Sequence, residues 1–138
     1  MRRVFVLMVV GLLLLTACEH DKDMESEGPL ASCGPAPSTL AGTPMLPANF
    51  PSLSEVTYTG ATIAGPSTEI MGYWTGDLDA AFAGYKNALT GAGYQLTKTE
   101  MDAHDAEVNF SHSGTTGQVK LQEQCAGRVK VSITARPG

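Results

Sequence analysis

The chain has 138 residues, with 14 acidic and 9 basic side chains and a formal net charge of −5. This length allows a single domain. An acidic chain without a basic stripe is a poor partner for nucleic acid, so we expect no nucleic acid to bind. Hydrophobic residues make up 43% of the chain and glycine occurs 15 times, which indicates a globular domain rich in turns.

The first residues have the order of an export signal. Arg2 and Arg3 precede an apolar run over residues 4–15, and a charged segment followed by an apolar one is typical of secretory signal peptides. The run is too short to cross a bilayer as a helix, which needs about 20 residues. The alternative is a helix of the hydrophobic core, but such a helix is amphipathic, whereas this run is apolar on all sides.

The run ends in Leu15-Thr16-Ala17-Cys18, which resembles the lipobox of bacterial lipoprotein precursors. The resemblance implies that residues 1–17 are removed as a signal peptide and that the Cys18 thiol carries a diacylglycerol, with acyl chains such as palmitate. The protein would then be held by its lipid on the extracytoplasmic face of a membrane in the bacterial cell envelope. The alternative is an ordinary signal peptide in which Cys18 is incidental.

Residues 18–45 are predicted to be a flexible tether. Without Arg2 and Arg3 the chain keeps seven basic residues against its 14 acidic ones, a formal charge of −7. Acidic residues crowd directly behind Cys18 and repel anionic headgroups, so the membrane is held by acyl chains alone. Prolines between Pro35 and Pro47 disfavour a helix. We expect the folded domain to occupy residues 46–138.

Cys33 and Cys125 remain once Cys18 is assigned to lipid. An even pair of cysteines in an exported chain predicts a disulfide. The loop that it closes contains nearly the whole domain, and loop entropy then gives about 4–5 kcal/mol of stability. The alternative is two buried free thiols. Structural zinc is disfavoured because neither cysteine has a second one at ligand spacing.

A hairpin and a helix are predicted first along the domain. Residues 55–62 and 67–75 are rich in β-branched and aromatic residues and are separated by the turn pair Gly65-Pro66. Asp77 is a good N-cap for a helix over residues 78–90. The helix is indicated by apolar residues that recur at Leu78, Phe82, Tyr85 and Leu89.

Four extended segments are predicted after the helix, over residues 94–99, 107–112, 118–124 and 128–134. In the last of them apolar and polar residues alternate strictly, which is typical of an antiparallel strand with one buried face. Turn residues fill positions 114–117 and 125–127. The predicted fold is α+β, an antiparallel sheet of about five or six strands with one helix on one face. The order is β-β-α-β-β-β if three of the last four segments are strands, and has one more strand if all four are.

The predicted domain also resembles small exported bacterial α+β domains of uncharacterised function. The resemblance covers roughly residues 46–135. It implies a fold but no activity, because it depends on packing and turn residues: Leu46-Pro47, Phe50-Pro51, Tyr85, Leu89 and Gly93-Tyr94.

One stretch gathers side chains of the kind that bind metals. They are Glu100, Asp102, His104, Asp105, Glu107 and His112. Imidazole and carboxylate groups bind zinc or copper when they converge, but alternate residues of a strand point to opposite faces. We favour an acidic, solvated loop that leads into a strand, and therefore predict no metal and no cofactor. The alternative is a small metal-handling lipoprotein that uses His104, His112 and nearby carboxylates.

No catalytic constellation is recognisable, so we expect no enzyme. Ser111 and Ser113 flank His112, but neighbours on a strand point in opposite directions, and no Gly-x-Ser-x-Gly elbow occurs. Tyr58, Tyr73 and Trp74 are interpreted either as core residues or as an aromatic surface for a ligand.

The expected function is a non-catalytic binding or envelope-accessory module. Its expected partners are the membrane, through the lipid on Cys18, and an envelope protein. The expected contact surface is the polar face of the sheet or an exposed edge strand, because unpaired edges invite strand pairing.

Overall fold

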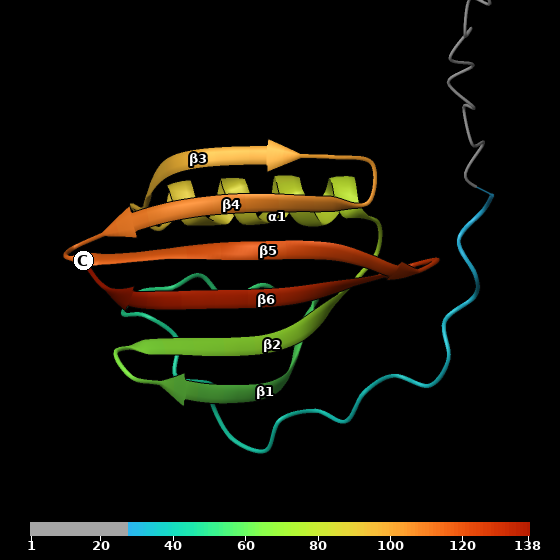
Figure 1. Ribbon diagram of the computed structural model, residues 1–138, viewed down its shortest axis with the longest axis horizontal. Coiled ribbons are helices and arrows are strands. Elements are labelled where there is room, and N and C mark those ends of the chain that lie inside the picture. Colours follow the sequence, from blue (N-terminus) through green and yellow to red (C-terminus); the bar gives the residue numbers. More distant parts are fainter. Residues whose placement is uncertain (1–27) are drawn as a thin grey trace, which may run out of the picture.

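The computed structural model describes residues 28–138. The predicted signal peptide, the lipidation of Cys18 and the first part of the tether lie outside the described residues. The described part confirms the α+β prediction: a six-stranded antiparallel sheet with one helix against one face (Figure 1). Its elements are β1 (Val56–Ala64), β2 (Ser67–Thr75), α1 (Leu78–Gly91), β3 (Gln95–Met101), β4 (Asp105–His112), β5 (Thr115–Cys125) and β6 (Arg128–Pro137).

The strands lie in the order β1-β2-β6-β5-β4-β3. Strands β3 to β6 form a meander, and the β1–β2 hairpin joins it where β2 pairs with β6. The helix carries the chain from β2, inside the sheet, to β3 at the far edge, and it contacts β3, β4 and β5. Figure 1 looks onto the opposite face of the sheet, with α1 behind β3 and β4.

The helix begins and packs as its sequence predicts. Asp77 caps it, because Oδ1 accepts a hydrogen bond of 2.7 Å from the Ala80 amide. The side chains of Leu78, Ala81, Tyr85 and Leu89 are buried against the sheet, whereas Phe82 lies at the margin, under the Lys86 ammonium at 4.8 Å. In the part of the chain that the structure describes, no helix is long and apolar enough to span a membrane.

The core lies between α1, the strands and a coil that precedes them. Strands β2, β4, β5 and β6 each bury alternate apolar residues on the helix side of the sheet. The coil contributes Phe50, whose ring packs on Tyr94 at 5.8 Å and on Phe110 at 5.6 Å. The Tyr94 hydroxyl also donates a 2.8 Å hydrogen bond to the Ala48 carbonyl. The coil therefore adds apolar side chains to the core beside the helix.

Two predicted boundaries are wrong. Residues 100–106, expected to be a solvated loop, mostly belong to β3 and β4, and the connection between them is only residues 102–104. Strand β3 is an edge strand that is exposed along most of its length, so it needs no apolar alternation to form. The next turn is shorter than predicted as well: Ser113 and Gly114 have φ values of 46° and 75°, which suit a two-residue hairpin loop.

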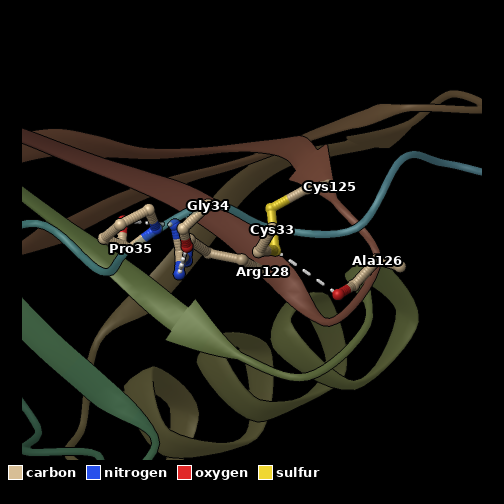
Figure 2. The surroundings of a disulfide bond; sticks show 6 residues. All are labelled: Cys33, Gly34, Pro35, Cys125, Ala126 and Arg128. Atoms are coloured by element: carbon tan, nitrogen blue, oxygen red, sulfur yellow. Dashed lines mark hydrogen bonds between the residues drawn. A yellow bond between two sulfur atoms is a disulfide. The ribbon is translucent and has the colours of Figure 1, made fainter.

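Residues 28–45, here called the strap, are attached to one end of the sheet. The predicted Cys33–Cys125 disulfide is present (Figure 2). Beside it, the Arg128 guanidinium donates hydrogen bonds to the carbonyls of Gly34 at 2.9 Å and Pro35 at 3.3 Å. The strap is therefore attached to the domain next to the β5–β6 turn by the disulfide and by the two hydrogen bonds from Arg128.

Two tyrosine hydroxyls are buried without a hydrogen-bond partner among residues 28–138, those of Tyr58 and Tyr85. Burial raises the pKa of Tyr85 far above its ordinary value of 10.0, and the neighbouring Tyr58 raises it further. A buried hydroxyl without a partner costs free energy. The ring of Tyr85, and not its hydroxyl, therefore stabilises the core.

We expect Tyr85→Phe to leave the free energy of unfolding at pH 7 unchanged within about 0.5 kcal/mol, or to raise it, because no hydrogen bond is lost. Tyr94→Phe is the matched control. It removes the hydrogen bond to the Ala48 carbonyl and should cost about 1 kcal/mol. Urea unfolding measures both, and a larger loss for Tyr85→Phe than for Tyr94→Phe contradicts the expectation.

The stabilities of the parent protein and of Tyr85→Phe should respond differently to a pH above 10. The unfolded chain ionises Tyr85 near its ordinary pKa, whereas the raised pKa keeps the folded chain protonated. The stability linked to Tyr85 is therefore fully present below pH 10 and falls as the pH rises further, by up to about 1.4 kcal/mol per pH unit. Tyr85→Phe removes this term, so its urea midpoint should fall less between pH 9 and pH 11 than that of the parent protein.

Candidate functional site

The polar face of the sheet is the face that points away from α1. Strand pairing aligns its residues in rows: Gln118 of β5 lies opposite Asn109 of β4 and Thr134 of β6, and Lys120 lies opposite Glu107 and Ser132. Successive residues of a strand point to opposite faces, so these rows lie on the side opposite the core. The sequence prediction of one buried and one polar face holds for the middle of the sheet.

Glu107 is the centre of a small polar network on this face. Its Oε2 accepts a 3.0 Å hydrogen bond from Gln118 Nε2, and its Oε1 lies 3.6 Å from the Lys120 ammonium. The same Gln118 nitrogen also donates to Asn109 Oδ1 at 3.3 Å. These contacts fix how the two amides are turned, because a carboxylate accepts hydrogen bonds and cannot donate them.

A hollow of about 330 Å³ lies beside this network. Its polar lining comes from four strands: Thr97, Asn109, Thr116, Gln118, Thr134 and Arg136. Gly117 and Phe110 also line it, and they pack closely, because a Cβ on Gly117 would lie 2.4 Å from Phe110 Cζ. The hollow lies toward the end of the sheet that holds the β4–β5 turn and the C-terminus (Figure 1).

Arg136 is the cation of the hollow. It is exposed, and within residues 28–138 its guanidinium makes neither an ion pair nor a side-chain hydrogen bond. On β2, Glu69 is engaged elsewhere, because its Oε1 accepts a 3.1 Å hydrogen bond from the Ser132 hydroxyl. Arg136 also borders a second hollow of similar volume, whose lining is mostly apolar and includes Met45 and Leu46 of the coil. The Arg136 guanidinium is therefore available to bind an anionic group of a ligand.

The structure does not bring the two candidate metal-binding histidines together. His104 lies just before β4, with Nδ1 2.7 Å from Glu123 Oε2. His112 lies at the other end of β4, where its ring stacks on Tyr94 at 4.6 Å and its Nδ1 lies 3.1 Å from the Gly93 carbonyl. The two histidines are eight positions apart along extended chain, which corresponds to about 26 Å.

The strand carboxylates of the same stretch lie on the polar face, away from both histidines. Glu100 lies opposite Glu107, and Asp105 lies one row further along β4, opposite Gln122. Lys98 neutralises Glu100 at 2.7 Å, and that contact raises the pKa of the lysine. No group of three metal-binding side chains occurs within the described residues 28–138.

The three aromatic residues do not form one surface either. Trp74 is buried in the core, 6.3 Å from the Tyr85 ring, and Tyr58 is partly buried against the same core. Tyr73 alone lies on the polar face, with the Arg128 guanidinium 5.5 Å from its ring. The core interpretation therefore holds for Trp74, and an aromatic platform is not assembled.

Sequence reasoning did not single out the residues that line the hollow. Threonine and amide side chains belong to no motif, and each of them is ordinary on an exposed strand. The available signal is the polar alternation in β4, β5 and β6, which places Asn109, Gln118 and Thr134 on one face. These residues form a single row only because of the register of the three strands, and the alternation in the sequence does not predict that register.

Comparison of the chain with protein-family models, with curated proteins and with solved structures finds no match. The chemistry of the polar face is therefore inferred from its own side chains.

Proposed function

We propose that the protein is a lipid-anchored, extracytoplasmic binding module without catalytic activity, and that it holds its ligand on the polar face of the sheet. The observation that carries this proposal is the hollow of about 330 Å³ on a face that α1 leaves uncovered. Small-molecule sites are typically concave and carry a few convergent polar groups. The polar network around Glu107 gives the hollow a fixed set of hydrogen-bonding groups.

The membrane anchor is supported by sequence and by cysteine chemistry. The Leu15-Thr16-Ala17-Cys18 sequence places a cysteine directly after an apolar export segment. The disulfide between Cys33 and Cys125 supports export, because disulfides persist in oxidising compartments and are rare in the cytosol. A diacylglycerol with further acylation gives stable attachment, where a single acyl chain is marginal.

The position of the strap supports presentation of the hollow away from the anchor. The strap reaches the sheet at Cys33, beside the β5–β6 turn, whereas Thr116 and Arg136 lie near the opposite end of their strands. Thr116 and Cys125 are nine positions apart on β5, which corresponds to about 30 Å. A tether that enters at one end of the sheet leaves the other end accessible to a ligand.

We expect Met71 to be protected from oxidation in the cell envelope. Met71 is 36% exposed and lies on the polar face opposite Ser132, whereas Met101 is 39% exposed at the end of β3 and lies opposite the buried Ala106, on the other face of the sheet. Hydroxyl-radical footprinting of intact producing cells, compared with the purified protein, should show reduced oxidation of Met71 and unchanged oxidation of Met101. A bound ligand on the polar face shields the first methionine and not the second.

Cys18→Ser is the matched variant for this measurement. It removes the predicted lipid attachment, so the variant should leave the membrane fraction while its domain remains folded. If the ligand belongs to the envelope surface, Met71 of the released variant should be oxidised as in the purified protein. Equal oxidation of Met71 in cells and in purified protein argues against a ligand on the polar face, and membrane retention of Cys18→Ser argues against the anchor.

A further inference from the structure

The lining of the hollow combines hydrogen-bond donors with acceptors. Three threonine hydroxyls, two amides and one guanidinium border it. Each hydroxyl and each amide offers both a donor and an acceptor. A ligand that carries several hydroxyl groups matches such a lining, because each of its hydroxyls also donates and accepts.

The orientation of the amides makes this match more specific. Gln118 Nε2 is committed to Glu107 at 3.0 Å and to Asn109 Oδ1 at 3.3 Å. Oε1 of Gln118 is then left to accept from a ligand, and Nδ2 of Asn109 is left to donate to one. A donor and an acceptor held side by side suit two adjacent hydroxyl groups on a ring.

The charges near the hollow favour a ligand with one negatively charged group. Lys98 and Lys120 are paired with Glu100 at 2.7 Å and Glu107 at 3.6 Å, whereas Arg136 has no acidic partner among residues 28–138. A guanidinium matches a carboxylate with two parallel hydrogen bonds. The chain as a whole carries a formal charge of −5 and repels polyanions. A ligand with a single carboxylate can pair with Arg136 and carries too little negative charge to be repelled by the acidic chain.

The size of the hollow limits the ligand. Its volume of about 330 Å³ lies at the lower end of the range for small-molecule sites. This is room for one or two sugar rings. The remaining lining, Phe110 and Gly117, offers no charge to a second anionic group.

We propose that the hollow binds a short saccharide of one or two rings that carries one carboxylate. The carboxylate lies on Arg136, and the ring hydroxyls bond to Gln118, Asn109 and the threonines of the neighbouring strands. The proposal rests on the proposed function, since it names the ligand class of the same site.

Isothermal titration of the full chain, extracted from membranes in detergent, tests this ligand class. The probes are cellobiouronate, which has two rings and one carboxylate, cellobiose, which has the same rings without charge, and glucose 6-phosphate. We expect cellobiouronate to bind about tenfold more tightly than cellobiose. Arg136→Gln should weaken cellobiouronate binding by about tenfold, with no loss of cellobiose binding.

Lys130→Gln is the matched control, because Lys130 lies on the same face of β6 but opposite Gln122, toward the other end of the strand. It should leave binding unchanged. Three results overturn the proposal: equal binding of cellobiose, tighter binding of glucose 6-phosphate, or an equal loss for Lys130→Gln. If none of the three probes binds while Met71 is protected in cells, the ligand class is wrong but the binding module stands. If Met71 is not protected either, the proposed function fails as well.

Discussion

Reduction of the Cys33–Cys125 disulfide is expected to lower the free energy of unfolding by about 4–5 kcal/mol. The two cysteines are 92 residues apart in sequence. The bond therefore restricts nearly the whole domain in the unfolded state, and the loop-entropy contribution grows with the length of the closed loop. Small domains have only about 5–15 kcal/mol of stability in total, so the loss should be a large fraction of the whole.

The reduced protein should nevertheless keep its fold under native conditions. The strap retains the hydrogen bonds from Arg128 to the Gly34 and Pro35 carbonyls, and the Leu40 amide still donates to the Tyr58 carbonyl at 2.7 Å. The strands of the sheet pair independently of the strap. Reduction thus changes the unfolding equilibrium far more than it changes the folded structure.

Guanidinium unfolding with and without reductant measures this effect. The double variant Cys33→Ser, Cys125→Ser is the control, because it should unfold like the reduced parent and should not respond to reductant. An unfolding midpoint that is the same for the oxidised and reduced parent contradicts the loop-entropy argument. Arg128→Gln tests the hydrogen bonds between Arg128 and the strap. It should lower the stability of the reduced protein more than that of the oxidised protein, because in the oxidised protein the disulfide still holds Cys33 in place.

Local sequence signals were sufficient for the elements of the fold. The four-three-four spacing of apolar residues in α1 and the strict alternation in β6 each report one buried face, and both elements form where they were predicted. The edge strand β3 was the hardest to delimit, because exposed residues on both of its faces leave no alternation to detect. Burial is the source of the pattern, so a strand with little burial carries little signal.

Strand order and the hollow depend on contacts between distant parts of the chain. Strand β2 pairs with β6 across more than 50 residues of intervening sequence, and no local pattern specifies that choice. The candidate metal site failed to assemble for a related reason, because it was inferred from residue types close in sequence, whereas an extended strand separates His104 from His112. The hollow arises instead from residues that are ordinary one by one and meet through strand register.

Gly117→Ala should be strongly destabilising, with an expected loss of about 3 kcal/mol in the free energy of unfolding. A Cβ at Gly117 would lie 2.4 Å from Phe110 Cζ and 2.4 Å from the Thr134 carbonyl oxygen. The Phe110 ring is fully buried and packs on Phe50 at 5.6 Å and on Tyr94 at 5.3 Å, so it cannot move away from Gly117 without displacing one of these rings. The carbonyl belongs to the backbone of β6, next to β5 in the sheet, and moves only if the pairing is distorted.

Two further variants separate the causes of this loss. Gly84→Ala is the control, because its Cβ would meet only the Trp74 side chain, at 2.7 Å, and the exchange gains about 1 kcal/mol of helix propensity against that contact. It should therefore cost less than Gly117→Ala in urea unfolding. Phe110→Leu, placed in the Gly117→Ala background, should not restore stability, because the contact with the Thr134 carbonyl remains. Recovery in that double variant would assign the whole effect to the aromatic ring, and full stability of Gly117→Ala would show that β5 and β6 separate easily.

Because Gly117 and Phe110 also line the hollow, a distorted β5–β6 pair should move Gln118 relative to Thr134 and weaken ligand binding together with the fold.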